Sequence, residues 1–562
     1  MRNWRKKPLA MAALTVLVSG PAGTPSIVTA AGARADHDRD GDRTATPIKH
    51  VIIIIGENRT FDNVYGTYVP KRGQRVNNLL SRGIVNGDGS PGPESSRARQ
   101  FRLSTINPVR YFIDTNTLIG SGKAAYAPNL PTPEAGSAPP AAVTLSQFLT
   151  APAVTAPPFD GNTFSATRLH QISPVLAFTD LPLLTTGATG LKNCGASAAV
   201  PPVPCPVPDN RITNFATLPN TSFQITGQNV PYDSYTGDMV HRFFHMWQQS
   251  DCDASNASFT DPAGCRNDLY PFVGIGRGDD SGGNSMGFFN VQNGDAPVFE
   301  SLADEFTLSD NFHQSVMGGT AANHMALGTG DAIFWTTFMG QTQPPLSQIA
   351  DPDPLNPAAS DKYTRDKAWT NCGDLSQPGV PAVFSYLTSL HLNSNCQNVF
   401  YMVNNLSPGF LPNGTVDSAS ILAGTKVPPS ALRTIGDELN DHNISWAYYG
   451  GGYDAAVRVA NGSTDPTDTA IAQNYCDICN FESYVTSIMG SSAQRATHIK
   501  DAIDFFSDLQ AGTLPAVSFV KPDSYVDGHP ASSKARLVRG DAGEHRRSDE
   551  RSERHRIVRR IR

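Results

Sequence analysis

The sequence has little charge and no internal repeat. After its N-terminal residues it has no apolar run that could span a bilayer. Only 17% of its 562 residues are charged, and the net charge is −7. A negative balance gives no general reason to expect a nucleic-acid partner. Gly and Pro contribute 48 and 43 residues, and 39% of the chain is hydrophobic. This composition predicts a loop-rich globular protein with a sizeable core.

The N-terminus has the pattern of an export signal. Basic residues within Arg2–Lys7 precede a short apolar run, Leu9–Val18, and small residues follow, so that cleavage after Ala30 or Ala35 is expected. A membrane anchor is the alternative, but the run is too short to cross a bilayer. We therefore predict a signal peptide over 1–35, a polar linker over 36–46, and a periplasmic or secreted protein without a stable membrane span.

The eight cysteines suit the same oxidising compartment. The last two form a C-x-x-C, Cys476-Asp-Ile-Cys479, for which metal binding is the competing interpretation. We favour disulfides, because one such spacing without a second nearby pair is a weak zinc signal. The cysteines fall into four pairs of sequence neighbours, Cys194 and Cys205, Cys252 and Cys265, Cys372 and Cys396, and Cys476 and Cys479.

Alternating helix-like and strand-like segments predict an α/β sandwich. Val51–Ile55 is a β-branched run typical of a strand buried on both faces of a parallel sheet. Residues 126–208, rich in Pro, Ala, Thr and Ser, indicate a long irregular insertion. Helices are predicted over 238–247, 299–306 (leading to a strand), 383–392, 429–440 and 496–509, and strands over 445–449 and 516–521.

Three polar segments carry residues suited to chemistry. In the first, Glu57 and Asn58 follow the Val51–Ile55 strand, and a carboxylate beside a carboxamide at a strand end offers oxygen ligands for a hard divalent cation. Arg59 can pair with a phosphate. The alternative is an ordinary strand-to-helix loop in which Asp62 caps the helix.

The second segment places Thr320 directly after Gly318-Gly319, with Asn323 and His324 one turn further on. A hydroxyl on a tight turn at a helix N-terminus can attack phosphorus, and the helix amides can hold anionic oxygens. The alternative is that Thr320 is only an N-cap.

The third segment follows the strand predicted over 516–521 and contains Asp523, Asp527 and His529. Such groups suit a phosphate-binding or proton-donating loop, although a surface turn rich in Asp, Gly and Pro is the alternative. His241, in a predicted helix, is a further candidate, although a lone histidine there is more often structural.

Together the three segments resemble a known family. Ile48-Lys49-His50, the apolar strand and the Glu-Asn-Arg-Thr-Phe-Asp that follows are similar to the opening signature of the bacterial phosphoesterase family that contains phospholipases C and the AcpA-type acid phosphatases. The Gly-x-Thr-x-x-Asn at Thr320 and the strand ending in His529-Pro530 resemble its later motifs. The resemblance covers roughly 48–533, and it implies an alkaline-phosphatase-like fold in which a mostly parallel sheet lies between helices.

The resemblance also implies roles for single residues. Glu57 and Asn58 would bind a divalent metal cation, and Thr320 would be the nucleophile that forms a phospho-enzyme. His529 would contact phosphate or assist the leaving group, and His241 would be a second histidine. We further expect a small phosphate ester or a phospholipid as substrate. The expected substrate-binding residues are Arg59, Asn323 and His324.

The last residues depart from the family. The family completes its metal site with an Asp-Glu or Asp-Asp pair a few tens of residues after the His-Pro, and Asp549-Glu550 lacks the apolar strand and Gly-Gly that should flank such a pair. Residues 534–562 hold eleven Lys or Arg and five Asp or Glu. A shifted reading frame near Lys534 would explain this run of arginine. The alternative function is therefore a truncated, inactive family member, while a disordered end or an anion-binding tail remain open.

Overall fold

The computed structural model describes most of three long stretches of the chain. These are residues 47–98, 286–345 and 401–524. Shorter described pieces are 219, 221–226, 241–250, 258–259, 264–265, 267, 270, 348–350, 368–373, 375, 380–393 and 526–529, with the backbone of short strands at 103–107, 110–113, 143–144, 191–192 and 207–208. The predicted signal peptide, the linker, most of the 126–208 insertion and the 534–562 tail lie outside the described residues.

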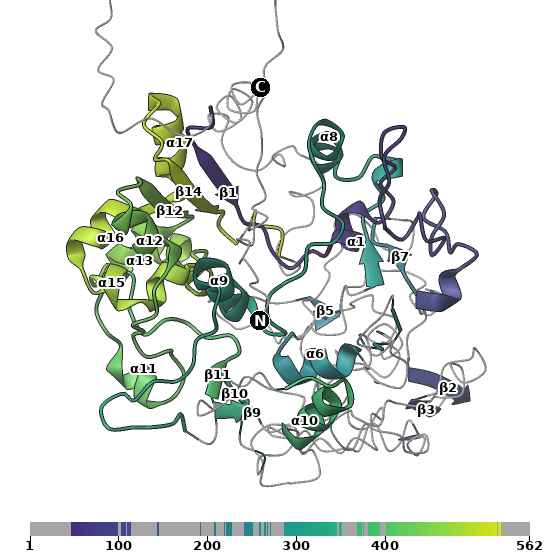
Figure 1. The fold of residues 1–562 in the computed structure, drawn as a ribbon, viewed down its shortest axis with the longest axis horizontal. Coiled ribbons are helices and arrows are strands. Elements are labelled where there is room, and N and C mark those ends of the chain that lie inside the picture. The colour runs from purple at the N-terminus through teal and green to yellow at the C-terminus, as the bar shows by residue number, and fades with distance from the viewer. Residues whose placement is uncertain are drawn as a thin grey trace, which may run out of the picture.

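A four-stranded parallel sheet forms the centre of the fold (Figure 1). Its strands lie in the order β1 (Val51–Ile54), β14 (Val517–Lys521), β12 (Trp446–Gly450) and β13 (Ile499–Asp501). All three pairings are parallel, with Ile53 opposite Phe519 and Phe519 opposite Tyr448. The predicted mostly parallel α/β sheet is therefore confirmed. Because the strands are parallel, their carboxyl ends meet at one edge.

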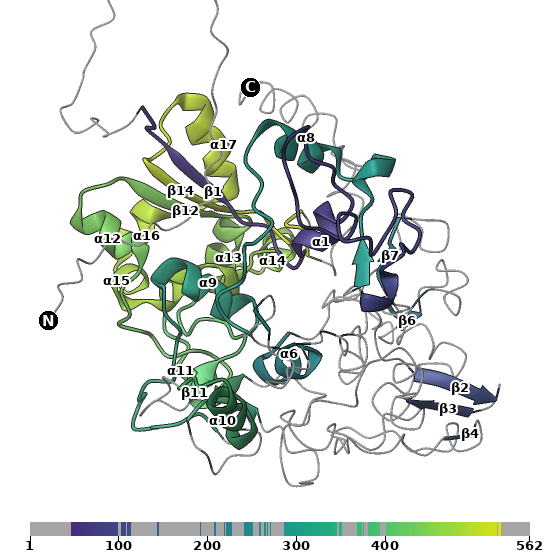
Figure 2. The same cartoon turned by 45° about the vertical axis from the view of Figure 1, so that its right-hand side comes forward.

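Alternate residues of these strands face two different cores. Tyr448 and Phe519 point into the largest apolar cluster, which includes residues of α9 (Thr320–Thr329). Tyr449 and Val520 point to the other face and pack with Phe505 of α17 (Ala502–Ala511). Figures 1 and 2 show α17 on one side of the sheet and α9, α12 (Ile435–Asp441), α15 (Thr486–Met489) and α16 (Ser492–His498) on the other. The period-two pattern of apolar residues thus produces the layered sandwich.

The sequence predicts that the first strand is buried on both faces, but the structure shows it partly exposed. Among the described strands, β1 lies at the edge of the sheet, paired with β14. Its residues are only partly buried, and Ile54 is 60% exposed. A run of β-branched residues favours a strand but does not reveal how many neighbours the strand has.

The helix predicted over 496–509 is wrong in its middle. The chain there forms α16 (Ser492–His498), then β13, then α17. Asp501 ends the strand and caps α17, since its side chain accepts a hydrogen bond from the Ile503 amide and it shares a capping box with Asp504. Local helix signals therefore concealed a short central strand.

The other predicted elements differ mainly at their ends. The helix predicted over 429–440 begins only at Ile435, where Thr434 is the N-cap. The strand expected after 299–306 is not found among residues 306–319. Besides α1, which belongs to the second core, the other α-helices among the described residues are α6 (Phe243–Ser250), α8 (Pro297–Glu305), α10 (Val380–Ser389), α11 (Ser418–Leu422), α13 (Tyr453–Ala460) and α14 (Pro466–Ala472).

A second, smaller core forms beside the sheet. It packs α1 (Phe61–Tyr65) and α8 against β7 (Phe223–Gln224) and β8 (Gly287–Phe288), with Phe289 at its centre. Figure 2 shows these elements together, apart from the sheet. The remaining strands are β2 (Leu103–Asn107), β3 (Arg110–Ile113), β4 (Val143–Thr144), β5 (Leu191–Lys192), β6 (Val207–Pro208), β9 (Ile349–Ala350), β10 (Trp369–Asn371) and β11 (Tyr401–Val403).

The C-x-x-C forms a disulfide between Cys476 and Cys479, as the sequence analysis favoured. Cys265 and Cys372 are disulfide-bonded as well. None of the helices in the described part of the chain has the length and apolar character of a membrane span.

Candidate active site

The first and second polar segments meet at the carboxyl edge of the sheet. Glu57 follows β1 at this edge, and Thr320 begins α9. The Thr320 hydroxyl donates a hydrogen bond of 2.9 Å to Oε2 of Glu57, across 263 residues of sequence. A hydroxyl hydrogen-bonded to a carboxylate is an arrangement that a nucleophile and its base would need in covalent catalysis.

Thr320 is not the N-cap of its helix. Gly319 holds that position in extended backbone conformation, and no side chain caps the helix from there. The Ala321 amide instead donates to Oδ1 of Asn405 at 2.9 Å, and the Gly319 amide donates to the Asn404 carbonyl at 3.2 Å. The loop after β11 therefore accepts the hydrogen bonds of the backbone amides at the start of α9. The Thr320 hydroxyl is left to bond to Glu57.

The turn before Thr320 is held by Asn323. Its carboxamide nitrogen lies 3.1 to 3.2 Å from the carbonyl oxygens of Val316, Gly318 and Gly319. Its Oδ1 accepts the Val316 amide at 3.1 Å. These contacts place the Asn323 side chain on the backbone of the turn and fix the entry to α9.

His324 lies beneath Thr320 and is only 6% exposed. Its Nδ1 is 3.0 Å from the Thr320 carbonyl oxygen, so Nδ1 carries the proton and donates it. Nε2 is buried and has no hydrogen-bond partner. Burial lowers the pKa of His324, although the nearby Glu57 carboxylate opposes this effect. The imidazole is therefore neutral, and its unprotonated Nε2 is buried without a hydrogen-bond partner.

The first and third segments are also bonded together. The carboxamide nitrogen of Asn58 lies 2.9 Å from Nε2 of His529, and Nε of Arg59 donates to the Gly528 carbonyl at 3.0 Å. The Glu57 amide donates to the Asp527 carbonyl at 3.0 Å. Asn58 has a φ of 55°, a left-handed conformation that Asn adopts more readily than most residues. Three consecutive residues thus anchor the loop that presents Glu57.

A buried lysine organises this contact. Lys521 ends β14 and its side chain is 1% exposed. Its ammonium lies 2.6 Å from Oδ2 of Asp527 and 3.6 Å from Oε1 of Glu57. The other Asp527 oxygen accepts the His529 amide at 2.9 Å. Lys521 is therefore the cation around which Glu57 and the His529 loop are arranged.

One basic group near Thr320, Arg242, was not singled out from the sequence. Arg242, at the start of α6, is buried, and its Nη1 lies 2.9 Å from where a side chain on Gly319 would begin. His241 precedes it, and the His241 carbonyl accepts a hydrogen bond from the same guanidinium at 3.1 Å. The contacts therefore place Arg242, the neighbour of the predicted His241, beside the Gly318–Thr320 turn. No local pattern distinguishes this arginine.

The donor atoms around Glu57 suit a metal cation. One ligand atom from each of Glu57, His324 and Cys479 lies within 4.8 Å of the others. Cys479 is in a disulfide, however, so its sulfur is not a thiolate. The Glu57 carboxylate, the Thr320 hydroxyl and the orphaned Nε2 of His324 still offer oxygen and nitrogen donors at one place. This donor set fits a divalent cation.

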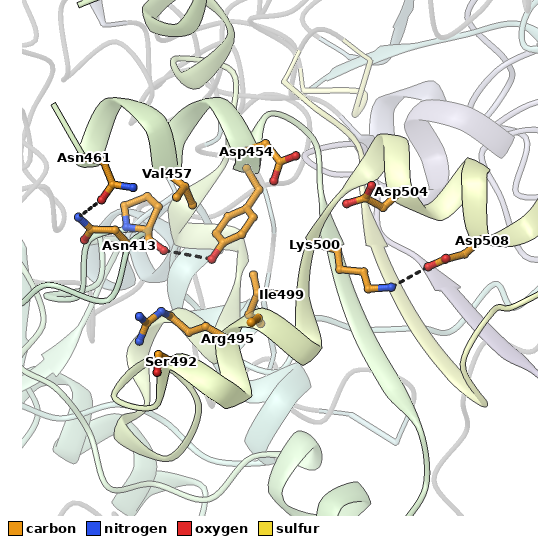
Figure 3. A pocket seen from close by; sticks show the side chains of 13 residues that line it. Asn413, Asp454, Val457, Asn461, Ser492, Arg495, Ile499, Lys500, Asp504 and Asp508 are labelled. Atoms are coloured by element: carbon orange, nitrogen blue, oxygen red, sulfur yellow. Dashed lines mark hydrogen bonds and ion pairs between the residues drawn. The ribbon is translucent and has the colours of Figure 1, made fainter. Parts of the chain in front are cut away.

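A cavity of about 630 Å³ lies elsewhere, between α13, α16 and α17 (Figure 3). Its wall includes Arg495, Lys500 and Asp504, and Lys500 donates to Asp508 at 2.8 Å. None of the predicted site residues lines it. This cavity is therefore separate from the Glu57–Thr320 pair.

Comparison with known proteins agrees with these observations. No curated protein matches the chain. The model of the Phosphoesterase family matches residues 207–539, which include Thr320 and His529 but not the Glu57 loop. Such proteins are generally metal-dependent, as the donor set at Glu57 allows. Since the match covers more than half of the chain, this protein belongs to the Phosphoesterase family, a membership that supports a phosphoric ester hydrolase.

Proposed function

We propose that this chain is an exported, metal-dependent phosphatase that hydrolyses phosphate esters through Thr320. The observation that carries the proposal is the hydrogen bond from the Thr320 hydroxyl to Glu57. Most threonines at a helix start bond to their own backbone. This hydroxyl instead meets a carboxylate from a different motif, at the edge of a parallel sheet where α/β proteins bind ligands.

The proposed reaction has two displacements at phosphorus. Thr320 Oγ1 attacks, its proton passes to Glu57, and the bond from phosphorus to the leaving oxygen breaks with its electron pair. Water then attacks the phosphothreonine and releases inorganic phosphate. His529 Nε2 accepts the hydrogen bond from Asn58. The ring proton of His529 therefore resides on Nδ1, from which the neutral imidazole is proposed to donate a hydrogen bond to the phosphate or to the leaving oxygen, while the leaving oxygen takes its proton from water.

The other predicted residues receive supporting roles. Glu57 and Asn58 are proposed to hold the divalent cation, which when bound neutralises charge on the phosphoryl oxygens. Arg59 and Arg242 offer guanidinium groups for the phosphate, with His241 beside them. Asn323 is proposed to act on the substrate indirectly, by fixing the turn. His324 is proposed to position Thr320 through the hydrogen bond to its carbonyl oxygen.

A direct test compares two threonines of the same helix. We expect Thr320→Val to lower kcat for p-nitrophenyl phosphate by about 10³-fold or more, because the nucleophile is lost. Thr329→Val removes a hydroxyl at the far end of α9, where it donates to the Met325 carbonyl at 2.7 Å. This control should leave kcat within about twofold, since Thr329 touches no proposed site residue. Acid quenching during turnover should trap phosphate on Thr320, as read by peptide mass spectrometry.

The same assay addresses the substrate and the metal. Hydrolysis of p-nitrophenylphosphorylcholine in place of p-nitrophenyl phosphate would instead identify a phospholipase C, the second candidate. Added EDTA should abolish turnover, and a divalent cation should restore it. If the purified chain hydrolyses neither substrate with any divalent cation, the proposal is wrong and the inactive alternative holds.

Export is proposed from the N-terminal pattern and the disulfides. Fractionation of an expressing bacterium should recover the protein outside the cytoplasm. Its first residue should then follow Ala30 or Ala35. An intact N-terminus in the membrane fraction would identify the anchor alternative.

A further inference from the structure

A disulfide lies directly against the proposed catalytic carboxylate. Sγ of Cys479 is 3.6 Å from Oε1 of Glu57, and Cys479 is fully buried. Its partner Cys476 is partly exposed. On the other side of Glu57 is His324, whose buried Nε2 has no partner. Three potential ligand atoms, one oxygen, one nitrogen and one sulfur, thus lie within 4.8 Å of one another.

We propose that Glu57, His324 and Cys479 form a binding site for a borderline-soft divalent cation, Zn²⁺, that is available only when the Cys476–Cys479 disulfide is reduced. The site shares Glu57 and His324 with the donor set described above, and it differs from that set by the Cys479 sulfur. It does not rest on the proposed function, since its evidence and its test concern metal binding alone.

The reduction has a defined chemistry. A thiolate of an external dithiol attacks Cys476 Sγ, which is the more exposed sulfur, and the disulfide bond breaks with its electron pair on Cys479 Sγ. The second thiol of the reductant then attacks the mixed disulfide and releases Cys476. The dithiol is oxidised to a cyclic disulfide, and its two protons pass to solvent or to the freed sulfurs. The product is a thiolate beside Glu57.

The ligand set and the local charge both favour zinc after this step. A histidine whose Nδ1 donates to a backbone carbonyl presents Nε2 to a metal, and the Thr320 carbonyl provides that contact. In the oxidised protein the Lys521 ammonium lies beside Glu57 and Asp527. The new thiolate adds a negative charge that Lys521 alone does not balance. Three protein ligands with one open position are a common zinc arrangement.

Two matched variants test the proposal without a reductant. Cys476→Ser leaves Cys479 as a thiol, whereas Cys479→Ser removes the proposed ligand, and both leave the other six cysteines unchanged. Each full-length variant is titrated with Co²⁺ and followed by absorption. We expect Cys476→Ser to bind one Co²⁺ with a thiolate-to-cobalt charge-transfer band that added Zn²⁺ removes. Cys479→Ser and the untreated parent should lack this band. Reducing and desalting the parent without oxygen should make the band appear.

A second measurement on the parent protein tests the proposal even if the cysteine variants misfold. Zn²⁺ should slow alkylation of Cys479 by iodoacetamide in the reduced parent at least about tenfold, as read by peptide mass spectrometry, because a bound thiolate is a poor nucleophile. His324→Gln in the Cys476→Ser background should weaken Co²⁺ binding about tenfold or more. An equal band in both cysteine variants, or Cys479 alkylation indifferent to Zn²⁺, would overturn the proposal whether or not the enzyme hydrolyses phosphate esters.

Discussion

Replacing Lys521 with methionine should strongly destabilise the protein. The Lys521 and Asp527 side chains are each 1% exposed, and their charged atoms are 2.6 Å apart. Methionine fills most of the lysine volume but leaves the Asp527 carboxylate buried without its cation. Breaking a buried pair in this way costs about 3–5 kcal/mol. The nearby Glu57 carboxylate, 3.6 Å from the same ammonium, loses a partner too.

The chain offers a matched pair nearer the surface. Lys500 and Asp508 lie 2.8 Å apart, with side chains 32% and 21% exposed. Lys500→Met should therefore cost about 1 kcal/mol or less, because solvent screens the remaining carboxylate. Both variants remove an ammonium from an aspartate partner, and they differ in burial and in the second carboxylate, Glu57, that lies near Lys521.

Urea unfolding measures the difference. The midpoints of the parent and both single variants are compared at one pH with a common denaturant slope. Adding Asp527→Asn to Lys521→Met should recover more than half of the loss, because the amide removes the buried charge and its oxygen can still accept the His529 amide. If Lys521→Met costs no more than Lys500→Met, the assignment of Lys521 as the organising cation is refuted.

Three further predictions concern other buried positions. Burial raises the pKa of the Glu482 carboxyl from 4.5 to about 8, so the stability that its proton provides is complete below pH 4.5 and is lost as pH rises through 8. The free energy of unfolding of the parent should decline by at most about 5 kcal/mol across this window, and Glu482→Gln should remove that decline. A plot of urea midpoint against pH should therefore be flatter for Glu482→Gln. It should not be flatter for Glu438→Gln, because the Glu438 side chain is exposed. A side chain on Gly328 would begin 2.3 Å from Phe481, so Gly328→Ala should cost about 1–3 kcal/mol, while Gly87→Ala, with nothing within 4 Å, should shift the midpoint little. A side chain on Gly319 would begin 2.6 Å from Asn405, so Gly319→Ala should lower kcat for p-nitrophenyl phosphate at least about tenfold by displacing the turn. An unchanged kcat would show that the turn tolerates the shift.

Sequence patterns predicted the positions of strands better than they predicted how buried each strand is and where it lies in the sheet. The strands expected at 445–449 and 516–521 match β12 and β14 within one residue at each end, because most of their residues are apolar. The same rule placed β1 in the sheet interior, but Ile54 is 60% exposed. Strand order depends on pairing between distant segments, and a local run of β-branched residues does not encode that order.

The short strand β13 escaped detection for a different physical reason. Ile499–Asp501 is flanked by helix-forming residues, and three residues are too few to show a period of two. Its pairing with β12 supplies the stability that its own sequence lacks. Asp501 was the available signal, since an N-cap residue marks a helix start.

The site was predicted in its motif residues and missed in their neighbours. Glu57, Asn58, Thr320 and His529 stood out because a carboxylate, an amide, a hydroxyl and an imidazole sit beside strand ends or turns, and their order resembled a known family. The structure joins them in two pairs, Glu57 with Thr320 and Asn58 with His529. Lys521 was not singled out from the sequence, because a lysine at the end of a strand is usually solvated.

Cys479 shows why such neighbours escape sequence analysis. Its C-x-x-C spacing was weighed as a disulfide or a metal site, as though one excluded the other. The structure confirms the disulfide but places its buried sulfur 3.6 Å from Glu57, a residue 422 positions away. The spacing alone could not reveal that a carboxylate and the bare Nε2 of His324 surround this sulfur. Under the zinc-site proposal the two interpretations would describe two redox states of the same cysteine pair, and Glu57 is the residue through which either state would affect Thr320.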